Sequence, residues 1–340
     1  KTIEEAYQLN PQFKALKNKK IKRNDGKMVE LKEVFEVAEK FEFVVDKLSK
    51  HAGGVLITPT DITDHFPIFG TDDERIVQWD KDDIEELGGV KFDFLGLKTL
   101  TMVGLAVKSI EKEYGIKIDT NEIVRNPNDP KVYELIASGK TQNLFQLNSS
   151  GMQQLCKAVK PSKFEHIVAI NALYRPPALA SGDTWRYARI KNGEEEEYYS
   201  HQEEKAITGE TYGIITYQEH VMQLVHHFAG WDYGYGDKLR KMTSEQLEEL
   251  RPKFLADSKA RGYDEKSMNE IWDRIVRYMG YGFNKSHGVA YSMLTYLTGW
   301  LEVHYPEHWM AAIMSVKMGE QEKIAQIYTD IKQEGFEVQA

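Results

Sequence analysis

The spacing of apolar residues predicts two kinds of structure along this chain. Residues 1–50 are predicted to be helical, because their apolar positions recur at roughly helical intervals around a turn at Asn24-Asp25-Gly26. The run Val55-Leu56-Ile57, ended by Pro59, predicts a short buried strand. Residues 90–95 predict a second strand. The first part of the chain is therefore expected to combine helices with short strands.

Helical periodicity dominates from residue 99 to the end of the chain. Glycine and proline residues separate the periodic segments, as expected where helices end. The predicted helices cover residues 99–114, 131–139, 149–159, 164–172, 218–228, 236–242, 244–260, 265–279, 289–305 and 320–333, and a shorter helix lies within residues 78–91. This pattern predicts an α+β protein, with a small mixed part followed by a large, mostly α-helical domain.

Composition narrows the class of protein. With 340 residues, 41% hydrophobic and 29% charged, the chain is long enough for two or three packed domains. A net charge of −9 argues weakly against nucleic-acid binding as a whole, although basic residues cluster locally between residues 14 and 27. A single cysteine, Cys156, excludes an internal disulfide and suits a reducing compartment. No apolar run reaches membrane-spanning length, so a cytoplasmic protein without a membrane partner is expected.

The two ends of the chain suggest a piece of a larger protein. The first residue is Lys1 rather than methionine, and residues 336–340 read as an interrupted strand. We therefore expect a fragment or the product of a divided gene.

The predicted strand at residues 90–95 carries a lysine and an aspartate on one face. Because side chains alternate along a strand, Val90, Phe92 and Phe94 are predicted to enter a core, and Lys91 and Asp93 to lie side by side on the opposite face. A carboxylate beside an ammonium group suits phosphate chemistry, since the carboxylate can hold Mg²⁺ and the lysine can neutralise a triphosphate. The spacing alone favours a plainer alternative, an amphipathic edge strand with a surface ion pair.

Several longer motifs resemble one family of enzymes. KFDFLGLKTLT resembles the palm motif of bacterial DNA polymerase III alpha subunits, the C-family replicative polymerases, and HAGGVLITPTDITDHFPIF resembles the segment that enters this palm. LFQLNSSGM, ALYRP, TYGIITYQEHVMQ, GYGFNKSHGVAYSM and YPEHWMAA look like segments of its fingers, in the family's order. The resemblance implies a thumb portion at residues 1–50, part of a polymerase-beta-like nucleotidyltransferase palm at 51–97, and a mostly helical fingers domain at 98–340.

The resemblance implies an incomplete palm site. Asp93 matches the third of three carboxylates that hold two Mg²⁺ ions, and Lys91 matches a residue near the triphosphate. The other two carboxylates belong to a proline-led D-x-D motif upstream of this sequence. Asp80-Lys81-Asp82 has that spacing but reads as the start of a helix, with Asp80 or Asp82 as the N-cap. A separate chain or segment carrying the rest of the palm is therefore an expected partner.

The fingers segments imply contacts with the nucleotide and the DNA. Ser286 and His287 match a pair beside the incoming sugar, although Ser286 alternatively caps the helix that follows. Arg240 matches a residue near the triphosphate, and Lys241 stands where the family has a second arginine, so its bidentate geometry is lost. The remaining candidates are Asn284 and Lys285 for the nucleotide, and Arg175 and Lys160 for DNA. Gln218 and Glu219 are interpreted as structural rather than catalytic.

These features support part of a DNA-directed DNA polymerase that adds dNTPs to a primer 3′-hydroxyl by a two-metal mechanism. Its expected partners are primer–template DNA, dNTPs and Mg²⁺, with replisome proteins as further candidates, in the nucleoid of a bacterium or a phage-infected cell. Two alternatives stay open: a non-catalytic DNA- or nucleotide-binding module, and a scaffold subunit whose sites have decayed. The intact Lys91-x-Asp93 and Ser286-His287 pairs argue against decay.

Overall fold

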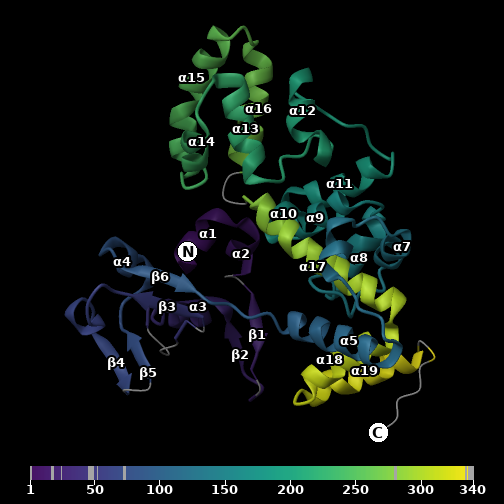
Figure 1. The fold of residues 1–340 in the computed structure, drawn as a ribbon. Coiled ribbons are helices and arrows are strands. Elements are labelled where there is room, and N and C mark those ends of the chain that lie inside the picture. The colour runs from purple at the N-terminus through teal and green to yellow at the C-terminus, as the bar shows by residue number, and fades with distance from the viewer. Residues whose placement is uncertain are drawn as a thin grey trace. The chain divides into compact units, whose positions relative to one another are not determined.

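The computed structural model divides the chain into two compact units, residues 1–96 and 97–340 (Figure 1). It describes residues 2–16, 19–23, 25–44, 50–51, 53–71, 74–278, 282–333 and 335. The first unit combines short helices with three two-stranded antiparallel sheets, and the second is built from helices. The α+β expectation agrees with this mixture. None of the helices among these residues is both long and apolar enough to cross a membrane.

The apolar spacing predicted that the N-terminal segment is helical throughout, and this prediction is wrong. Helices α1 (Ile3–Leu9), α2 (Pro11–Leu16) and α3 (Leu31–Glu39) flank a hairpin of β1 (Lys20–Lys22) and β2 (Met28–Glu30). The hairpin forms at the predicted turn, where Gly26 has a φ of +85° and the Asp25 carboxylate accepts a bond from the Lys27 amide. The end of the predicted helix, at residues 45–49, lies outside the described residues.

Both predicted strands of the first unit are present and pair with each other. Strand β3 (Gly54–Ile57) lies antiparallel to β6 (Val90–Asp93), with Val55 opposite Phe92 and Gly54 opposite Asp93. A second hairpin joins β4 (Ile68–Thr71) to β5 (Glu74–Val77), after a 3₁₀ turn, η1 (Ile62–Asp64). Helix α4 (Lys81–Glu86) begins directly after Asp80, which makes Asp80 rather than Asp82 the residue at the predicted cap position.

The predicted burial of this ribbon is wrong. Val90, Phe92 and Phe94 are 54%, 46% and 68% exposed, and Val55 and Ile57, predicted to be buried, are also exposed. Cross-strand partners share a face, so the apolar side chains of the two strands lie together. Two strands offer too little structure to cover that face, and the unit's buried apolar residues among those described, Phe66 and Ile84, lie elsewhere.

The second unit confirms every predicted helix, with boundaries shifted by a few residues. Prediction missed the helices at Thr120–Arg125, Pro176–Ser181, Asp183–Lys191 and Lys205–Thr208. It also missed the helix that begins at Pro306, although proline is well suited to a first helical position. The helices are α5 (Lys98–Tyr114), α6 (Thr120–Arg125), α7 (Pro130–Ser138), α8 (Ser150–Val159), α9 (Phe164–Leu173), α10 (Pro176–Ser181), α11 (Asp183–Lys191), α12 (Lys205–Thr208), α13 (Gln218–Ala229), α14 (Tyr233–Leu239), α15 (Ser244–Ala260), α16 (Glu265–Tyr278), α17 (Lys285–His304), α18 (Pro306–Lys317) and α19 (Gln321–Gln333), with 3₁₀ turns η2 (Gln202–Glu204) and η3 (Gly209–Thr211).

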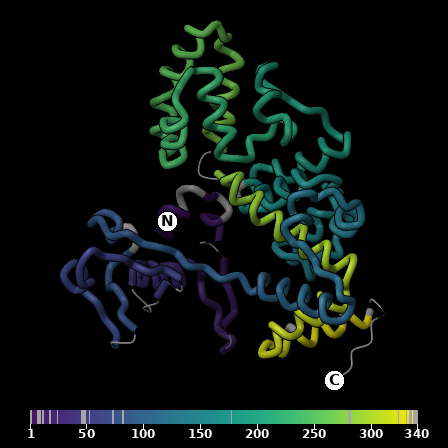
Figure 2. Tube along the Cα trace, in the orientation of Figure 1, coloured from purple at the N-terminus to yellow at the C-terminus, as the bar shows by residue number. Residues whose placement is uncertain are grey.

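Helix α17 contributes to two of the large hydrophobic clusters of this unit. Its Leu301 packs with residues of α5, α18 and α19, and its Tyr296 packs into the cluster of α7, α8 and α9. Figure 2 shows the blue trace of α5 beside the yellow trace of α18, although they lie far apart in sequence. Helices α13 to α16 form a further cluster around Phe254 and Trp272. Buried along much of its length, α17 is a rigid base for the residues at its N-terminal end.

Candidate functional site

Lys91 and Asp93 lie on the same face of β6, as the strand alternation predicted. The Lys91 Nζ lies 3.3 Å from Asp93 Oδ1, and the lysine side chain is only 16% exposed. His51 joins them, with its Nδ1 3.6 Å from the same carboxylate oxygen. The Asp93 side chain is 44% exposed, so its carboxylate is still accessible to a further ligand.

Two glycines at the start of β3, Gly53 just before it and Gly54 as its first residue, create the space for this arrangement. A Cβ at Gly53 would lie 2.4 Å from the carbonyl oxygen of Phe94, which is closer than real contacts allow. A Cβ at Gly54, directly opposite Asp93, would lie 2.9 Å from the His51 ring. The glycine pair therefore lets the backbone and the histidine approach the end of β6. Strand periodicity could not reveal His51, although it opens the HAGG segment.

Four of the candidate nucleotide-binding residues of the second unit, Asn284 to His287, lie at the start of α17. Asn284 caps this helix: its Oδ1 accepts bonds from the His287 amide at 2.8 Å and from the Ser286 hydroxyl at 2.6 Å. The alternative interpretation of Ser286 as the N-cap is therefore wrong, because the helix begins four residues earlier than its apolar spacing had indicated. Ser286 and His287 are both exposed, and Asn284 is committed to capping.

An internal carboxylate already occupies part of this helix N-terminus. Glu219 accepts bonds from the Lys285 amide at 3.0 and 3.1 Å and from the Asn284 side chain at 3.2 Å. Gln218 adds a bond from its Nε2 to the Gly282 carbonyl at 2.9 Å. These contacts agree with a structural role for Gln218 and Glu219, which join the start of α13 to the start of α17.

The Lys285 ammonium is also committed to a partner within the protein. Its Nζ lies 2.6 and 2.8 Å from the two carboxylate oxygens of Glu210. Hydrogen bonding from His220 and Lys285 lowers the pKa of Glu210 to about 2, so this carboxylate is ionised at neutral pH. Burial lowers the pKa of His220, whose Nδ1 accepts a bond from the Thr216 amide, and its Nε2–H therefore donates to Glu210. Lys285 is thus less available to a nucleotide than its place in the motif suggested.

His287 and Arg175 line one cavity of about 310 Å³. The His287 ring lies 4.2 Å from the Tyr291 ring and 5.9 Å from the Phe283 ring, centre to centre. The Arg175 guanidinium lies over the Phe283 ring, 4.3 Å from its centre. The cavity is completed by Gln146, Asn148, Ser149, Met152, Asn171 and Tyr174. Aromatic rings beside side-chain amides suit a nucleoside, which offers both a flat surface and hydrogen-bonding edges.

The motif glycine after His287 is required by this packing. A Cβ at Gly288 would lie 2.4 Å from the Phe283 ring, so a larger residue would displace the ring from beneath Arg175. The backbone also positions Phe283, which forms a bridge with Tyr217.

The other predicted residues lie outside this cavity. Arg240 follows α14, and its Nε lies 2.6 Å from Asp237 in an exposed ion pair. Lys241 is exposed beside it, so the predicted basic pair follows the helix rather than lying on it. Lys160 ends α8 in a left-handed conformation, with a φ of 49°. The structure therefore brings His287 and Arg175 together but not Arg240, Lys241 or Lys160.

Asp93 alone does not complete a metal site. Among the described residues, no three histidine, cysteine or carboxylate side chains gather closely enough to hold a metal ion. Mg²⁺ takes oxygen ligands and is commonly held by one or two carboxylates together with substrate phosphates. The accessible Asp93 carboxylate fits one such ligand, and the remaining ligands would have to come from other residues and a substrate.

Both units match consecutive regions of one protein family. The model described as the bacterial DNA polymerase III alpha NTPase domain matches residues 1–96, and the one described as the bacterial DNA polymerase III alpha subunit finger domain matches residues 99–262. The chain belongs to the family of bacterial DNA polymerase III alpha subunits.

Individual relatives extend this match over nearly the whole chain. DNA polymerase III subunit alpha of Aquifex aeolicus is 38% identical over 91% of this chain, that of Escherichia coli K12 is 37% identical over 91%, and that of Bacillus subtilis is 35% identical over 99%. The matched regions make up 27%, 28% and 30% of those proteins, respectively. The chain thus spans less than a third of the length of these relatives.

Proposed function

We propose that this chain forms part of a DNA-directed DNA polymerase, which transfers nucleotides from dNTPs to a primer 3′-hydroxyl. In this proposal residues 1–50 belong to the thumb, residues 51–97 to the palm and residues 98–340 to the fingers. The polymerase works on primer–template DNA in the bacterial nucleoid. The observation that carries the proposal is the pairing of Lys91 with an accessible Asp93, on one face of β6, in a chain of this family.

Asp93 and Lys91 would have different roles in the palm. Asp93 would be one of three carboxylates that hold Mg²⁺, and the metal, when bound, would neutralise charge on phosphate oxygens. Lys91 keeps the carboxylate in place through its 3.3 Å contact and would contribute positive charge toward a triphosphate. The other two carboxylates would come from another segment of the polypeptide or from a separate chain.

The second unit would hold the nucleotide and the DNA. His287 would lie against the sugar, with its ring supported by Tyr291, and Arg175, which lies over the Phe283 ring, would contact the DNA. Arg240 would reach the triphosphate only after leaving Asp237, which an exposed ion pair permits at little cost.

The substitution Asp93→Asn tests the catalytic assignment in a polypeptide that also carries the remaining palm carboxylates. We expect the rate of nucleotide incorporation to fall by several orders of magnitude while affinity for primer–template DNA stays nearly unchanged, because a metal ligand acts mainly on the transition state. Single-turnover incorporation and DNA binding measure the two effects.

A matched control is Asp64→Asn, which removes an exposed carboxylate from the same unit. Incorporation by this variant should equal that of the wild type. A loss of less than tenfold in Asp93→Asn would correspond to less than about 1.4 kcal/mol and would leave Asp93 as a surface charge.

A further inference from the structure

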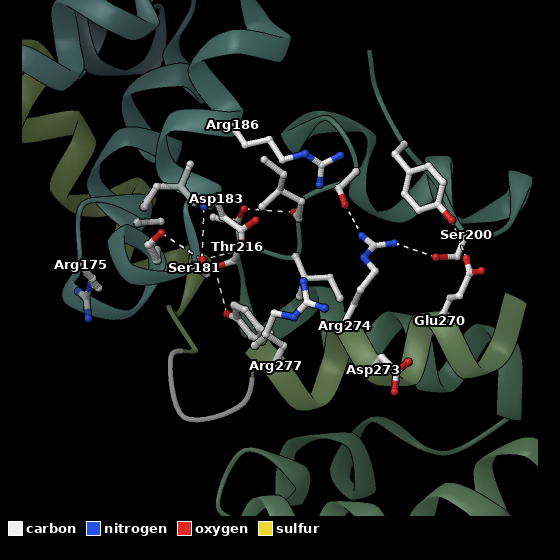
Figure 3. Close-up of a pocket in the computed structure, with 18 residues that line it drawn as sticks. Arg175, Ser181, Asp183, Arg186, Ser200, Thr216, Glu270, Asp273, Arg274 and Arg277 are labelled. Carbon is white, nitrogen blue, oxygen red and sulfur yellow. Dashed lines mark hydrogen bonds between the residues drawn. The ribbon is translucent and has the colours of Figure 1, made fainter. Parts of the chain in front are cut away.

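A second cavity of about 310 Å³ lies between α9, α10, α11, α16 and the segment before α13. Four arginines line it: Arg175, Arg186, Arg274 and Arg277 (Figure 3). The last two lie three residues apart on α16 and so share one face of that helix, whose opposite face is buried among the residues of α13 and α15.

Two of these arginines are occupied within the protein. Arg274 forms an ion pair with the fully buried Glu204, at 2.7 Å, and also donates to the Gly213 carbonyl. Arg186 lies 2.7 Å from Glu195. Glu204 is the carboxylate partner of Arg274, whereas Arg186 shares Glu195 with Arg189, whose Nη2 lies 2.9 Å from it. Both ion pairs hold the cavity wall in place.

The carboxylates that line the cavity also have partners. Asp273 lies 2.6 Å from the Arg251 guanidinium, which is outside the cavity. Glu270 accepts a bond from the Tyr198 hydroxyl at 2.5 Å, and Asp183 accepts one from the serine two residues before it. No carboxylate in the cavity wall forms an ion pair with either of the remaining two arginines.

Arg175 and Arg277 are the cations left for a ligand. Both are exposed, and within the described part of the chain neither guanidinium group donates a hydrogen bond or forms an ion pair. Arg175 rests on the Phe283 ring, a contact that leaves its N–H groups free. Arg175 also lines the His287 cavity, so the two cavities adjoin at this residue.

We propose that this arginine cavity binds a phosphate group of a single-stranded nucleic acid, through Arg277 and Arg175. Guanidinium groups match phosphate oxygens in geometry as well as charge. The ring of Tyr198, 49% exposed in the same wall, offers a surface on which a base can stack. A strand rather than a lone ion fits the position of Arg175, because a connected ligand can occupy both cavities. Arg277 thereby extends the DNA contact proposed for Arg175.

Strand binding by the 340-residue chain tests this proposal without any catalysis. Anisotropy of a short fluorescein-labelled oligothymidylate is measured against increasing sodium chloride. We expect Arg277→Gln to weaken binding roughly three- to tenfold and to reduce the slope of log K against log salt by about 0.7, the value for one phosphate contact on a single strand. Arg277→Lys should keep the slope and lose part of the affinity, because lysine keeps the charge but lacks the planar guanidinium group that can donate two parallel hydrogen bonds to phosphate.

Arg125→Gln is the control, since it removes an exposed arginine from the same unit but outside the cavity. Its affinity and slope should equal those of the wild type. Wild-type affinity and slope in Arg277→Gln would overturn the proposal, and so would an absence of strand binding by the unaltered chain at low salt.

Competition with dTTP separates the sources of phosphate: if Arg277→Gln weakens dTTP binding but not strand binding, the site holds a free nucleotide and the strand proposal is wrong. None of these outcomes affects the Asp93→Asn test, so the strand proposal and the proposed polymerase function can fail separately.

Discussion

At the scale of single residues, the structure separates exposed groups from groups that already have partners. His287 is exposed and supported by aromatic rings, whereas Lys285, two residues earlier, is held by Glu210. Both stand in one short motif, which gives no sign of this difference. Sequence spacing correctly predicted that Lys91 and Asp93 share a face, because alternation along a strand is local. It wrongly predicted that Phe92 is buried, because burial depends on what covers the sheet.

The position of His287 leads to a prediction about sugar selection. If its ring packs against C2′ of the incoming sugar, a 2′-hydroxyl has no room. We expect His287→Ala, in the completed polymerase, to lower the ratio of kcat/KM for a dNTP to that for the matching rNTP by roughly tenfold or more. Steady-state kinetics with the two nucleotides of one base measure the ratio.

Two further variants test whether the size of the side chain at residue 287 determines the sugar preference. His287→Phe keeps a ring of similar size and should keep most of the discrimination. His65→Ala removes an exposed histidine of the first unit and should change nothing. An unchanged ratio in a folded His287→Ala enzyme would remove this residue from the sugar site.

At the scale of elements, the start of α17 is fixed by the start of α13. Three consecutive residues make this connection. Tyr217 forms a backbone β-bridge with Phe283, and the Gln218 side-chain amide donates a hydrogen bond to the Gly282 carbonyl. The Glu219 carboxylate accepts one from the Lys285 amide. The existence and approximate length of both helices followed from apolar periodicity. Their contact did not, because more than sixty residues separate Glu219 from Lys285. The β1–β2 hairpin was missed for a related reason. Each of its strands has only three residues, which is too short for strand alternation to be distinguished from helical spacing.

Removing the Glu219 charge should loosen this connection. In Glu219→Gln, one acceptor oxygen becomes an NH₂ group that faces the Lys285 amide. We expect the free energy of unfolding to fall by about 1.5–3 kcal/mol, the usual contribution of hydrogen bonds to a charged group. In the completed polymerase, KM for all four dNTPs should rise more than kcat falls, because His287 and Ser286 are displaced together.

Denaturant unfolding and dNTP kinetics measure these effects, with Glu249→Gln on the exposed face of α15 as the control. Lower stability with an unchanged KM would show that Glu219 stabilises the fold without positioning the nucleotide site. Wild-type stability would show that the carboxylate contributes nothing to the start of α17.

At the scale of the whole molecule, each of the two units carries its own candidate residues. Asp93 and Lys91 belong to residues 1–96, and His287, Arg240 and Arg175 to residues 97–340. Motif order indicated the family, and the comparisons confirmed it. The mostly helical character of the second unit was predictable because its longer helices carry apolar residues at helical spacing. The small sheets of the first unit have exposed apolar faces, which periodicity cannot distinguish from a core.

The central claim is that Asp93 of this chain supplies one carboxylate of a polymerase site, and primer extension by complementation tests it most directly. The purified chain is incubated with primer–template DNA, dNTPs and Mg²⁺, alone and together with a polypeptide that carries the upstream palm and its D-x-D carboxylates. We predict no extension by either polypeptide alone, extension by the mixture, and none when the chain carries Asp93→Asn. Robust extension by the chain alone, or a mixture no more active than its separate components, would contradict the account.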